Sequence, residues 1–224
     1  MISIVIPALN EAPIARQRLE GLQWLRGVGH ELILVDGGSV DATRSIAGPL
    51  VDQLLNSRPG RALQLNAGAA VARGNILWFL HIDSVIPPRA DGLVVDVVTD
   101  GDGWGRFDVR LSGEAAMFRV IETLMNLRSC VTGICTGDQG VFVRRDLFEK
   151  VGGFPEIALM EDVALSKRLK RIGRPRCLHH PIETSSRRWE RDGIWRTVLA
   201  MWFLRTAYQF GADPAWLAEI YYPH

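Results

Sequence analysis

The chain of 224 residues carries 26 Lys and Arg against 25 Asp and Glu, a net charge of +1. This balance gives no global argument for nucleic-acid binding. A composition of 47% hydrophobic and 23% charged residues also excludes a disordered protein. The length suits one α/β domain that buries enough surface to fold without a disulfide or a metal.

The cysteines and the N-terminal residues indicate where in the cell the protein is located. Cys130, Cys135 and Cys177 are too few and too irregularly spaced for a disulfide framework or a zinc site, so we expect free thiols in a reducing cytosol. The N-terminus lacks the basic flank and cleavage site of a signal peptide. No apolar run approaches the roughly 18 residues that a membrane span requires. We therefore expect a cytoplasmic protein that is at most peripheral at the inner membrane face.

The first hundred residues alternate between two patterns. Short apolar runs predict buried strands at residues 2–6, 32–35 and 76–80, with a further strand at 51–55. Helical spacing predicts helices at 12–25 and 61–72, and a shorter one after Asp41. Alternation of strands and helices with short connections indicates βαβ units, and therefore a Rossmann-like, mostly parallel sheet flanked by helices.

The second half is less regular and contains no internal repeat or linker, so we expect a single domain. Its patterns predict strands at 107–111 and 140–143, and helices at 114–127, 146–151, 161–172 and about 193–210. The last helix carries Trp195, Trp202 and Phe203 beside arginines, as an interfacial helix does. Packing of these aromatic side chains onto the sheet is the commoner arrangement and the one we expect, with weak membrane contact as the alternative.

Polar residues follow each early strand. The first strand is followed by Asn10-Glu11, the second by Asp36-Gly-Gly-Ser39 and the third by His81-Ile-Asp83. Ligands of open α/β sheets bind beyond the carboxyl ends of the strands, so these residues predict one polar pocket. The alternative is that Asn10, Ser39 and Asp41 cap helices and that the glycines form turns.

The sequence lacks the P-loop, the dinucleotide-binding glycine motif, the G-x-S-x-G elbow and the H-E-x-x-H zinc motif. What remains is a site built on carboxylates, in which Asp83 is a suitable hard ligand for Mg²⁺ or Mn²⁺ together with substrate phosphates. Glu161-Asp162 opens a basic helix, where acids are also favoured by the helix dipole. The segment Arg187-Arg188-Trp189 can bind a diphosphate, or its guanidinium and indole groups can stack on the surface without a ligand.

Several motifs occur in a characteristic order. Residues 4–11 read IVIPALNE, residues 35–43 read VDGGSVDAT and residues 79–83 read FLHID. This set resembles the family 2 glycosyltransferases, which have the GT-A fold. GRALQLNAG at 60–68, GDQG at 137–140 and the Arg-Arg-Trp ending at Trp189 resemble a compact bacterial subfamily more closely. The resemblance extends from Ile4 to about residue 210.

The resemblance implies transfer of a hexose from a nucleotide sugar, often a UDP-sugar, to an acceptor hydroxyl with inversion and with Mn²⁺ or Mg²⁺ as cofactor. It implies a nucleotide-binding half at about 1–98, an acceptor and catalytic half at about 99–192, and a C-terminal helix and tail at 193–224. The implied nucleotide-binding residues are Pro7, Ala8, Asn10, Glu11, Asp36, Gly38, Arg61, Asn66, His81, Ile82 and Asp83.

The resemblance also assigns the chemistry. Asp162 matches the catalytic base, with Glu161 and Arg188 beside it, and Asp83 matches the last acid of a metal-binding Asp-x-Asp motif. The implied diphosphate and acceptor contacts are Asp138, Gln139, Arg187, Arg188 and Trp189.

Two residues depart from the family pattern. His81 stands in place of the first acid of Asp-x-Asp, which leaves Asp83 as the metal ligand. Ser185 replaces the Gln of Gln-x-x-Arg-Trp, and with it the contact that this Gln would make. The sequence also has no membrane segments of the kind found in processive polysaccharide synthases, which argues against polymer extrusion.

Two other functions are alternatives to transfer. A sugar-nucleotide pyrophosphorylase needs a Gly-rich N-terminal loop, whereas residues 7–15 read PALNEAPIA. A non-catalytic nucleotide-sugar-binding protein is favoured by His81 and disfavoured by Glu161-Asp162. No motif specifies the sugar or the acceptor, and the expected acceptor loops are 101–105 and 129–137.

Overall fold

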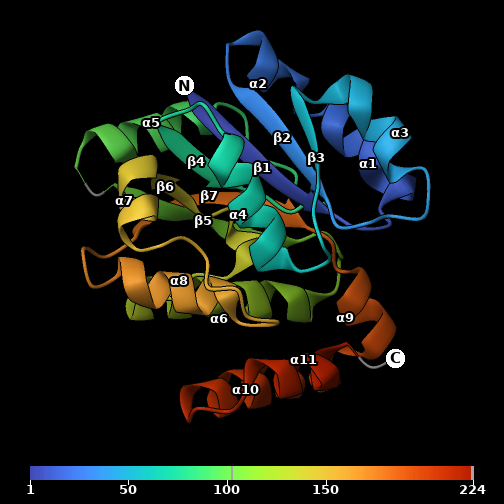
Figure 1. Cartoon of the computed structure of the whole chain (residues 1–224). Coiled ribbons are helices and arrows are strands. Elements are labelled where there is room, and N and C mark those ends of the chain that lie inside the picture. Colours follow the sequence, from blue (N-terminus) through green and yellow to red (C-terminus); the bar gives the residue numbers. More distant parts are fainter. Residues whose placement is uncertain (102, 223–224) are drawn as a thin grey trace.

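The computed structural model describes residues 1–101 and 103–222. Its centre is one seven-stranded sheet of order β3-β2-β1-β4-β6-β5-β7 (Figure 1). The strands are β1 (Ile2–Ala8), β2 (Glu31–Asp36), β3 (Gln53–Asn56), β4 (Ile76–Phe79), β5 (Trp104–Leu111), β6 (Phe142–Arg144) and β7 (Arg176–Thr184). Among these described strands only β6 runs antiparallel to its neighbours. The prediction of a mostly parallel α/β sheet in a single domain is confirmed.

Helices cover both faces of this sheet. They are α1 (Ala12–Glu20), α2 (Gln23–Gly27), α3 (Thr43–Ala47), η1 (Gly48–Leu50), α4 (Arg61–Val71), α5 (Ala90–Thr99), α6 (Ala116–Thr132), η2 (Gly137–Gln139), α7 (Arg145–Lys150), α8 (Glu161–Leu169), α9 (Arg187–Asp192), α10 (Ile194–Gln209) and α11 (Pro214–Tyr221).

Alternate residues of β1 enter two different cores. Ile4 and Ile6 pack in a core that includes residues of α1 and α5, whereas Val5 packs in one that includes residues of α4 and α8. Both faces of β1 are therefore buried, as its continuous apolar run predicts. A side chain at Gly68 of α4 would overlap Val5, so glycine lets this helix lie close to the sheet. This packing holds the N-terminus of α4, with Arg61, at the carboxyl edge of the strands.

Several elements differ from the prediction. The expected helix 12–25 divides at Gly21 into α1 and α2, and the expected helix 161–172 ends at Leu169. Helices α5, α9 and α11 and strand β7 were not predicted. Of the expected acceptor loops, residues 104–105 belong to β5 and residues 129–132 to α6, while residue 102 lies outside the described residues, as do residues 223–224 of the expected tail.

The C-terminal helices form a layer beyond α6 and α8 (Figure 1). Helix α10 buries Leu204 against Met160 and Val163, but Trp195, Trp202 and Phe203 are 67%, 71% and 51% exposed. The expectation that these aromatic residues pack onto the sheet is therefore wrong, because α10 carries apolar residues on all its sides and only one side meets the domain. No helix within the described ranges has both the length and the apolarity to cross a bilayer.

Two of the three cysteines are paired. A disulfide joins Cys130 near the end of α6 to Cys177 in β7, with Cα atoms 6.0 Å apart, and only Cys135 is free and buried. The prediction of three free thiols is wrong. The two residues are separated by 47 positions in sequence. Their proximity arises because α6 packs against β5, the neighbour of β7 in the sheet, and it leaves no local signal in the sequence.

Candidate active site

The loops after β1 and β2 are tied together at the carboxyl edge of the sheet. The fully buried carboxylate of Asp36 accepts hydrogen bonds from the Gly38 amide at 3.0 Å, the Ser39 amide at 2.9 Å and the Ser39 hydroxyl at 2.5 Å. The Ser39 hydroxyl in turn accepts from the Asn10 amide at 2.8 Å. Gly38 has a φ of 95°, which suits glycine. Hydrogen bonds thus hold the two loops together at the carboxyl edge of the sheet, and the loops are not two independent turns.

Side chains from each loop accept hydrogen bonds from the backbone of the other loop. Asn10 Oδ1 accepts from the Val40 amide at 2.9 Å, and Asp41 Oδ2 accepts from the Ala12 amide at 3.1 Å. Neither α1 nor α3 is capped by the side chain of its own N-cap residue. Asp41 Oδ1 also accepts from the backbone amide of Thr43, the first residue of α3, at 2.9 Å. The capping alternative therefore holds for Asp41, whereas Asn10 and Ser39 bridge the two loops instead.

A second group combines two carboxylates with a guanidinium. Asp83 Oδ2 accepts from the Ser185 amide at 3.4 Å, and Arg187 lies 3.9 Å from the Glu11 carboxylate. Burial raises the pKa of Glu11, the charges of Asp83 and Asp41 raise it further, and Arg187 opposes them. Glu11, Asp83 and Arg187 therefore meet at one place, although they come from three distant segments.

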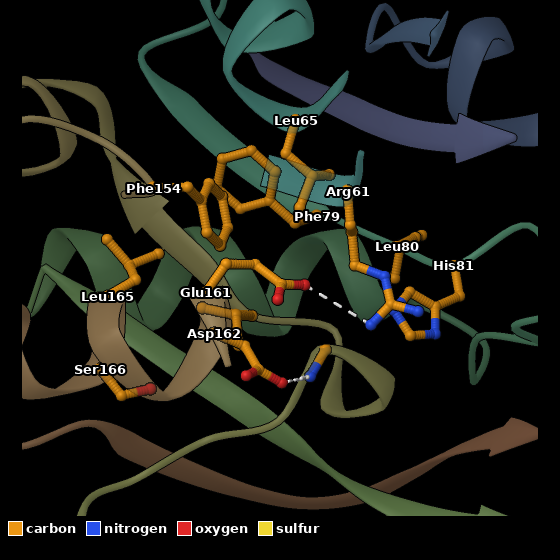
Figure 2. A pocket seen from close by; sticks show the side chains of 12 residues that line it. Arg61, Leu65, Phe79, Leu80, His81, Phe154, Glu161, Asp162, Leu165 and Ser166 are labelled. Atoms are coloured by element: carbon orange, nitrogen blue, oxygen red, sulfur yellow. Dashed lines mark hydrogen bonds and ion pairs between the residues drawn. The ribbon is translucent and has the colours of Figure 1, made fainter. Parts of the chain in front are cut away.

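The third group lines a pocket beside the first two. It contains Arg61, His81, Glu161 and Asp162 (Figure 2). The Arg61 guanidinium lies 3.5 Å from Glu161 Oε1, and the amide of Gly137 donates to Asp162 Oδ2 at 2.8 Å. The backbone of η2 thus orients Asp162, while α4 supplies the cation next to Glu161.

Glu161 is almost completely buried. Burial and the neighbouring Asp162 charge raise the pKa of Glu161 to about 7, and Arg61 only partly opposes them. Met160, which precedes α8, has the left-handed φ of 71°. Strained backbone of this kind concentrates at functional sites because surrounding structure must hold it in place. Here it places two acids side by side in the first turn of α8.

The pKa of His81 lies below its ordinary value. Its ring lies next to the Arg61 guanidinium (Figure 2), and burial and that positive charge lower the pKa of His81. Nε2 of the ring is buried with no hydrogen-bond partner among the described residues. A Cβ at Gly137 would lie 2.7 Å from this nitrogen. Glycine at 137 is therefore required for the close approach of η2 to the ring.

Helix α11, an element that the sequence did not predict, completes the site. The Arg188 guanidinium stacks 3.6 Å from the centre of the Tyr221 ring and donates to the Tyr221 carbonyl at 3.0 Å. Burial raises the pKa of Tyr221, whereas Arg188 and Arg61 lower it. Helix α11 therefore brings Tyr221 into contact with Arg188 and within the electrostatic influence of Arg61, and no motif in the sequence marks this helix.

The sequence profile of Glycosyl transferase family 2 matches residues 3–152, which include the loops after β1, β2 and β4. The chain belongs to glycosyl transferase family 2. This confirms the resemblance found in the motifs. The profile ends before Glu161, so the carboxylate pair and Arg188 rest on the geometry described above.

The chain also resembles a curated bacterial protein at low identity. It is 26% identical over 202 residues to the probable glycosyltransferase YdaM of Bacillus subtilis, a match that covers 77% of this chain and 47% of that protein. The chain thus spans about half the length of this curated relative.

Solved glycosyltransferase structures share the fold. The mannosyltransferase PcManGT from Pyrobaculum calidifontis, in complex with GDP-Man and Mn²⁺, has a TM-score of 0.61 at 23% identity, covering 82% of this chain and 56% of that one. Glucosyl-3-phosphoglycerate synthase from Mycobacterium tuberculosis, in complex with Mn²⁺, UDP-glucose and phosphoglyceric acid, has a TM-score of 0.59 at 21% identity, covering 82% and 70%.

Some predicted family 2 contacts already have structural partners. The Ala8 carbonyl accepts from Gln64 Nε2 at 2.9 Å, and Ile82 is buried in the core. Asn66 uses its side-chain amide to bind the backbone N–H and carbonyl of Phe154. As ligand contacts, these residues and Pro7 remain predictions.

The other predicted contacts lie around η2 and α9. Gln139 is buried and forms a capping box with Thr136. Asp138 Oδ1 is buried with no hydrogen-bond partner among the described residues, so it is available to a ligand. Trp189 packs beside Phe118 in a small core. The Arg187-Arg188-Trp189 segment therefore does not form a single stack. Arg187 lies near Glu11, whereas Trp189 packs into the protein.

The donor set fits a divalent cation that shares its coordination with a substrate. No three metal-binding side chains within the described ranges form a complete centre. Asp83 and Glu11 nevertheless bring two negative charges close enough to raise the pKa of Glu11, a repulsion that a bound cation would relieve. Mg²⁺ and Mn²⁺ are commonly bound by one or two carboxylates together with substrate phosphates.

Proposed function

We propose that the protein transfers a hexose from a nucleotide sugar, with a UDP-sugar as the expected donor, to an acceptor hydroxyl with inversion. The observation that carries the proposal is the pair Glu161 and Asp162 in one pocket with Arg61 and His81, next to the loop network of Asp36. Transfer requires a carboxylate near the acceptor and a polar edge for the nucleotide, and family 2 membership supplies the reaction class.

Asp162 is the proposed general base. An acceptor hydroxyl is a weak nucleophile, so a positioned carboxylate must remove its proton as it attacks the anomeric carbon. The Gly137 amide holds Asp162 in one orientation. Glu161, whose Oε1 lies 3.5 Å from the Arg61 guanidinium, is the second candidate for this role.

The leaving nucleoside diphosphate gains negative charge that the protein must stabilise. Arg187 and Arg188 on α9 are the proposed cations for this charge, and Asp83 with Glu11 would hold the Mg²⁺ or Mn²⁺ ion. Such an ion, when bound, neutralises charge on the diphosphate oxygens. The Mn²⁺ complexes of PcManGT and of glucosyl-3-phosphoglycerate synthase support this assignment.

The proposal includes the functional division of the domain and its location. The nucleotide would bind mainly to residues 1–98, the acceptor to residues 99–192, and the C-terminal segment from 193 onward would cover the site. We also propose a cytoplasmic location with at most weak membrane contact, which fractionation at moderate salt tests.

The experiment is a melting-temperature assay with UDP and Mn²⁺. A ligand at a hundredfold excess over its Kd stabilises the folded state by roughly 2.7 kcal/mol. UDP should raise the melting temperature, Mn²⁺ should enlarge the rise, and Asp83→Ala should lose only the Mn²⁺-dependent part. Asp96→Ala, an exposed acid on α5, is the matched control and should behave as wild type.

Donor hydrolysis separates transfer from simple binding. Slow hydrolysis of one member of a nucleotide-sugar panel in the presence of Mn²⁺ supports the enzyme. Binding of UDP without turnover of any donor favours the non-catalytic nucleotide-sugar-binding protein. His81, which stands in place of an acid and has a lowered pKa, is the observation that supports this alternative. Melting curves that no nucleotide moves would reject both.

A further inference from the structure

A second pocket lies among α6, α8 and α10 and is lined by cations. Its volume is about 260 Å³. Arg128 comes from α6, Lys167 and Lys170 from α8 and the residue that ends it, and Arg205 from α10. No Asp or Glu of the described ranges is among the lining residues. Figure 1 shows α6 and α8 side by side, with α10 beyond them.

Neither arginine forms a direct ion pair with an acid of the described residues, although the Asp138 and Asp162 charges act on both. Nη1 of Arg128 is buried without a hydrogen-bond partner in the described part of the protein. Burial and the nearby Arg205 lower the pKa of Arg128 to about 10, and burial lowers that of Arg205. Residues 1–101 and 103–222 provide no ion pair for either. Half-buried cations that face each other are costly unless an anion joins them.

Two lysines line the same pocket. Lys170 donates to the Thr132 carbonyl at 2.6 Å, and Lys167 lies 4.9 Å from the centre of the Tyr208 ring. Neither contact neutralises a charge. All four cations are therefore available to one ligand.

Helix α8 contributes residues to both this pocket and the carboxylate pocket. Val163, Lys167 and Lys170 follow a spacing of four and three residues and line the basic pocket, whereas Asp162 and Leu165 line the carboxylate pocket. The Asp162 charge raises the pKa of Tyr208 and acts on both Arg128 and Arg205, and Asp138 also acts on the two arginines. A ligand that fills the basic pocket is thus within reach of the electrostatic influence of Asp162.

We propose that Arg128, Arg205, Lys167 and Lys170 bind a phosphate group of the acceptor and thereby place its hydroxyl beside Asp162. Guanidinium pairs match the geometry of phosphate oxygens, and their charge-assisted hydrogen bonds are roughly twice as strong as neutral ones. The statement that the phosphate belongs to the acceptor rests on the proposed function. The phosphate site itself stands on the geometry of the pocket.

The test is isothermal titration with inorganic phosphate at constant ionic strength, on protein saturated with UDP and Mn²⁺. Arg128→Gln combined with Arg205→Gln should weaken phosphate binding by about tenfold or more, which corresponds to ~1.4 kcal/mol. Arg171→Gln, an exposed arginine just beyond α8, is the matched control and should bind phosphate as wild type does. The single variants should each show part of the loss, and thermal melting verifies that all of them fold.

Equal phosphate affinity in the wild type and the double variant would overturn the proposal, as would no phosphate binding by the wild type. UDP titration of the same proteins keeps the two proposals apart. If the wild type does not bind UDP, the proposed nucleotide-sugar donor is rejected. The phosphate site is then judged by the phosphate titration alone.

A second measurement distinguishes the source of the phosphate. Sedimentation with phosphatidylglycerol vesicles, compared with phosphatidylcholine vesicles, should require Arg128 and Arg205 when the acceptor is a lipid headgroup. Binding of inorganic phosphate without vesicle binding identifies a soluble phosphorylated acceptor. Either result supports the site. If the double variant retains in full both vesicle binding and phosphate binding, the site is rejected.

Discussion

Asp162 receives a backbone hydrogen bond on each carboxylate oxygen, from Gly137 at 2.8 Å and from Val163 at 2.7 Å. Asp162→Asn keeps the size of the side chain and removes the proton acceptor. Sugar transfer should fall by about 10²–10⁴-fold, the usual contribution of general-base catalysis, while UDP affinity changes little. Initial rates with a verified acceptor, together with UDP titration, measure both quantities.

The matched control for this prediction is Asp146→Asn. Asp146 also lies in the first turn of a helix, and its Oδ1 also accepts from the next amide, that of Leu147 at 2.9 Å, but its side chain is 62% exposed. Transfer should be unaffected by this change. Near-wild-type transfer by Asp162→Asn would shift the role of base to Glu161 or Asp138.

The pKa of Glu161 predicts a pH dependence of stability. Its folded-state pKa of about 7 exceeds the ordinary value of 4.5. The folded protein therefore binds more protons than the unfolded protein between these values, and its stability falls as pH rises through them. Because Gln cannot ionise, Glu161→Gln should gain stability over wild type from pH 4.5 to pH 8, by about 3 kcal/mol at most.

Urea unfolding at several pH values checks this result. Glu149→Gln changes an exposed glutamate of α7 and should follow the wild-type pH dependence throughout. Parallel curves for Glu161→Gln and wild type would mean that Glu161 is already ionised in the folded protein at low pH, held so by Arg61.

At the scale of elements, the disulfide joins α6 to β7 across 47 residues of sequence. Closing a loop of this size restricts the unfolded protein and stabilises the folded one by about 4 kcal/mol in the chain-entropy model. Cys130→Ser should lower the melting temperature in non-reducing buffer. Dithiothreitol should lower that of the wild type similarly and leave the variant unchanged.

A thiol count in denaturant gives an independent check. The paired structure predicts one reactive thiol, that of Cys135, whereas three free cysteines would give three. A count of three in freshly purified protein would contradict the pairing. It would agree instead with the reducing cytosol that the sequence favoured, where disulfides are rare.

The helices of the C-terminal layer show why element boundaries and contacts were harder to predict than strands. Helix α10 carries apolar residues on all sides, so its pattern does not indicate which face packs. Strand β7 contains His179, His180 and Pro181 and is largely exposed, so it lacks the apolar run that marked β1, β2 and β4. Both elements take their places from tertiary partners.

At the scale of the whole molecule, the sheet order places the predicted polar loops together. Strands β2, β1 and β4 are neighbours and parallel, so the residues after each of them reach the same edge. Asp36, Glu11 and Asp83 could be assigned to one edge for this reason. The carboxylates Glu161 and Asp162 join them because α8 packs against the same core as α4.

The sequence by itself determined the fold class, the family and the chemical identity of the polar residues, because buried strands and short loop motifs depend on neighbouring residues. Tertiary structure alone decided the rest. It brought Tyr221 onto Arg188, paired Cys130 with Cys177 and surrounded one pocket with Arg128, Lys167, Lys170 and Arg205. These contacts join residues that are tens of positions apart, and packing between elements, which leaves no periodic trace in the sequence, creates them.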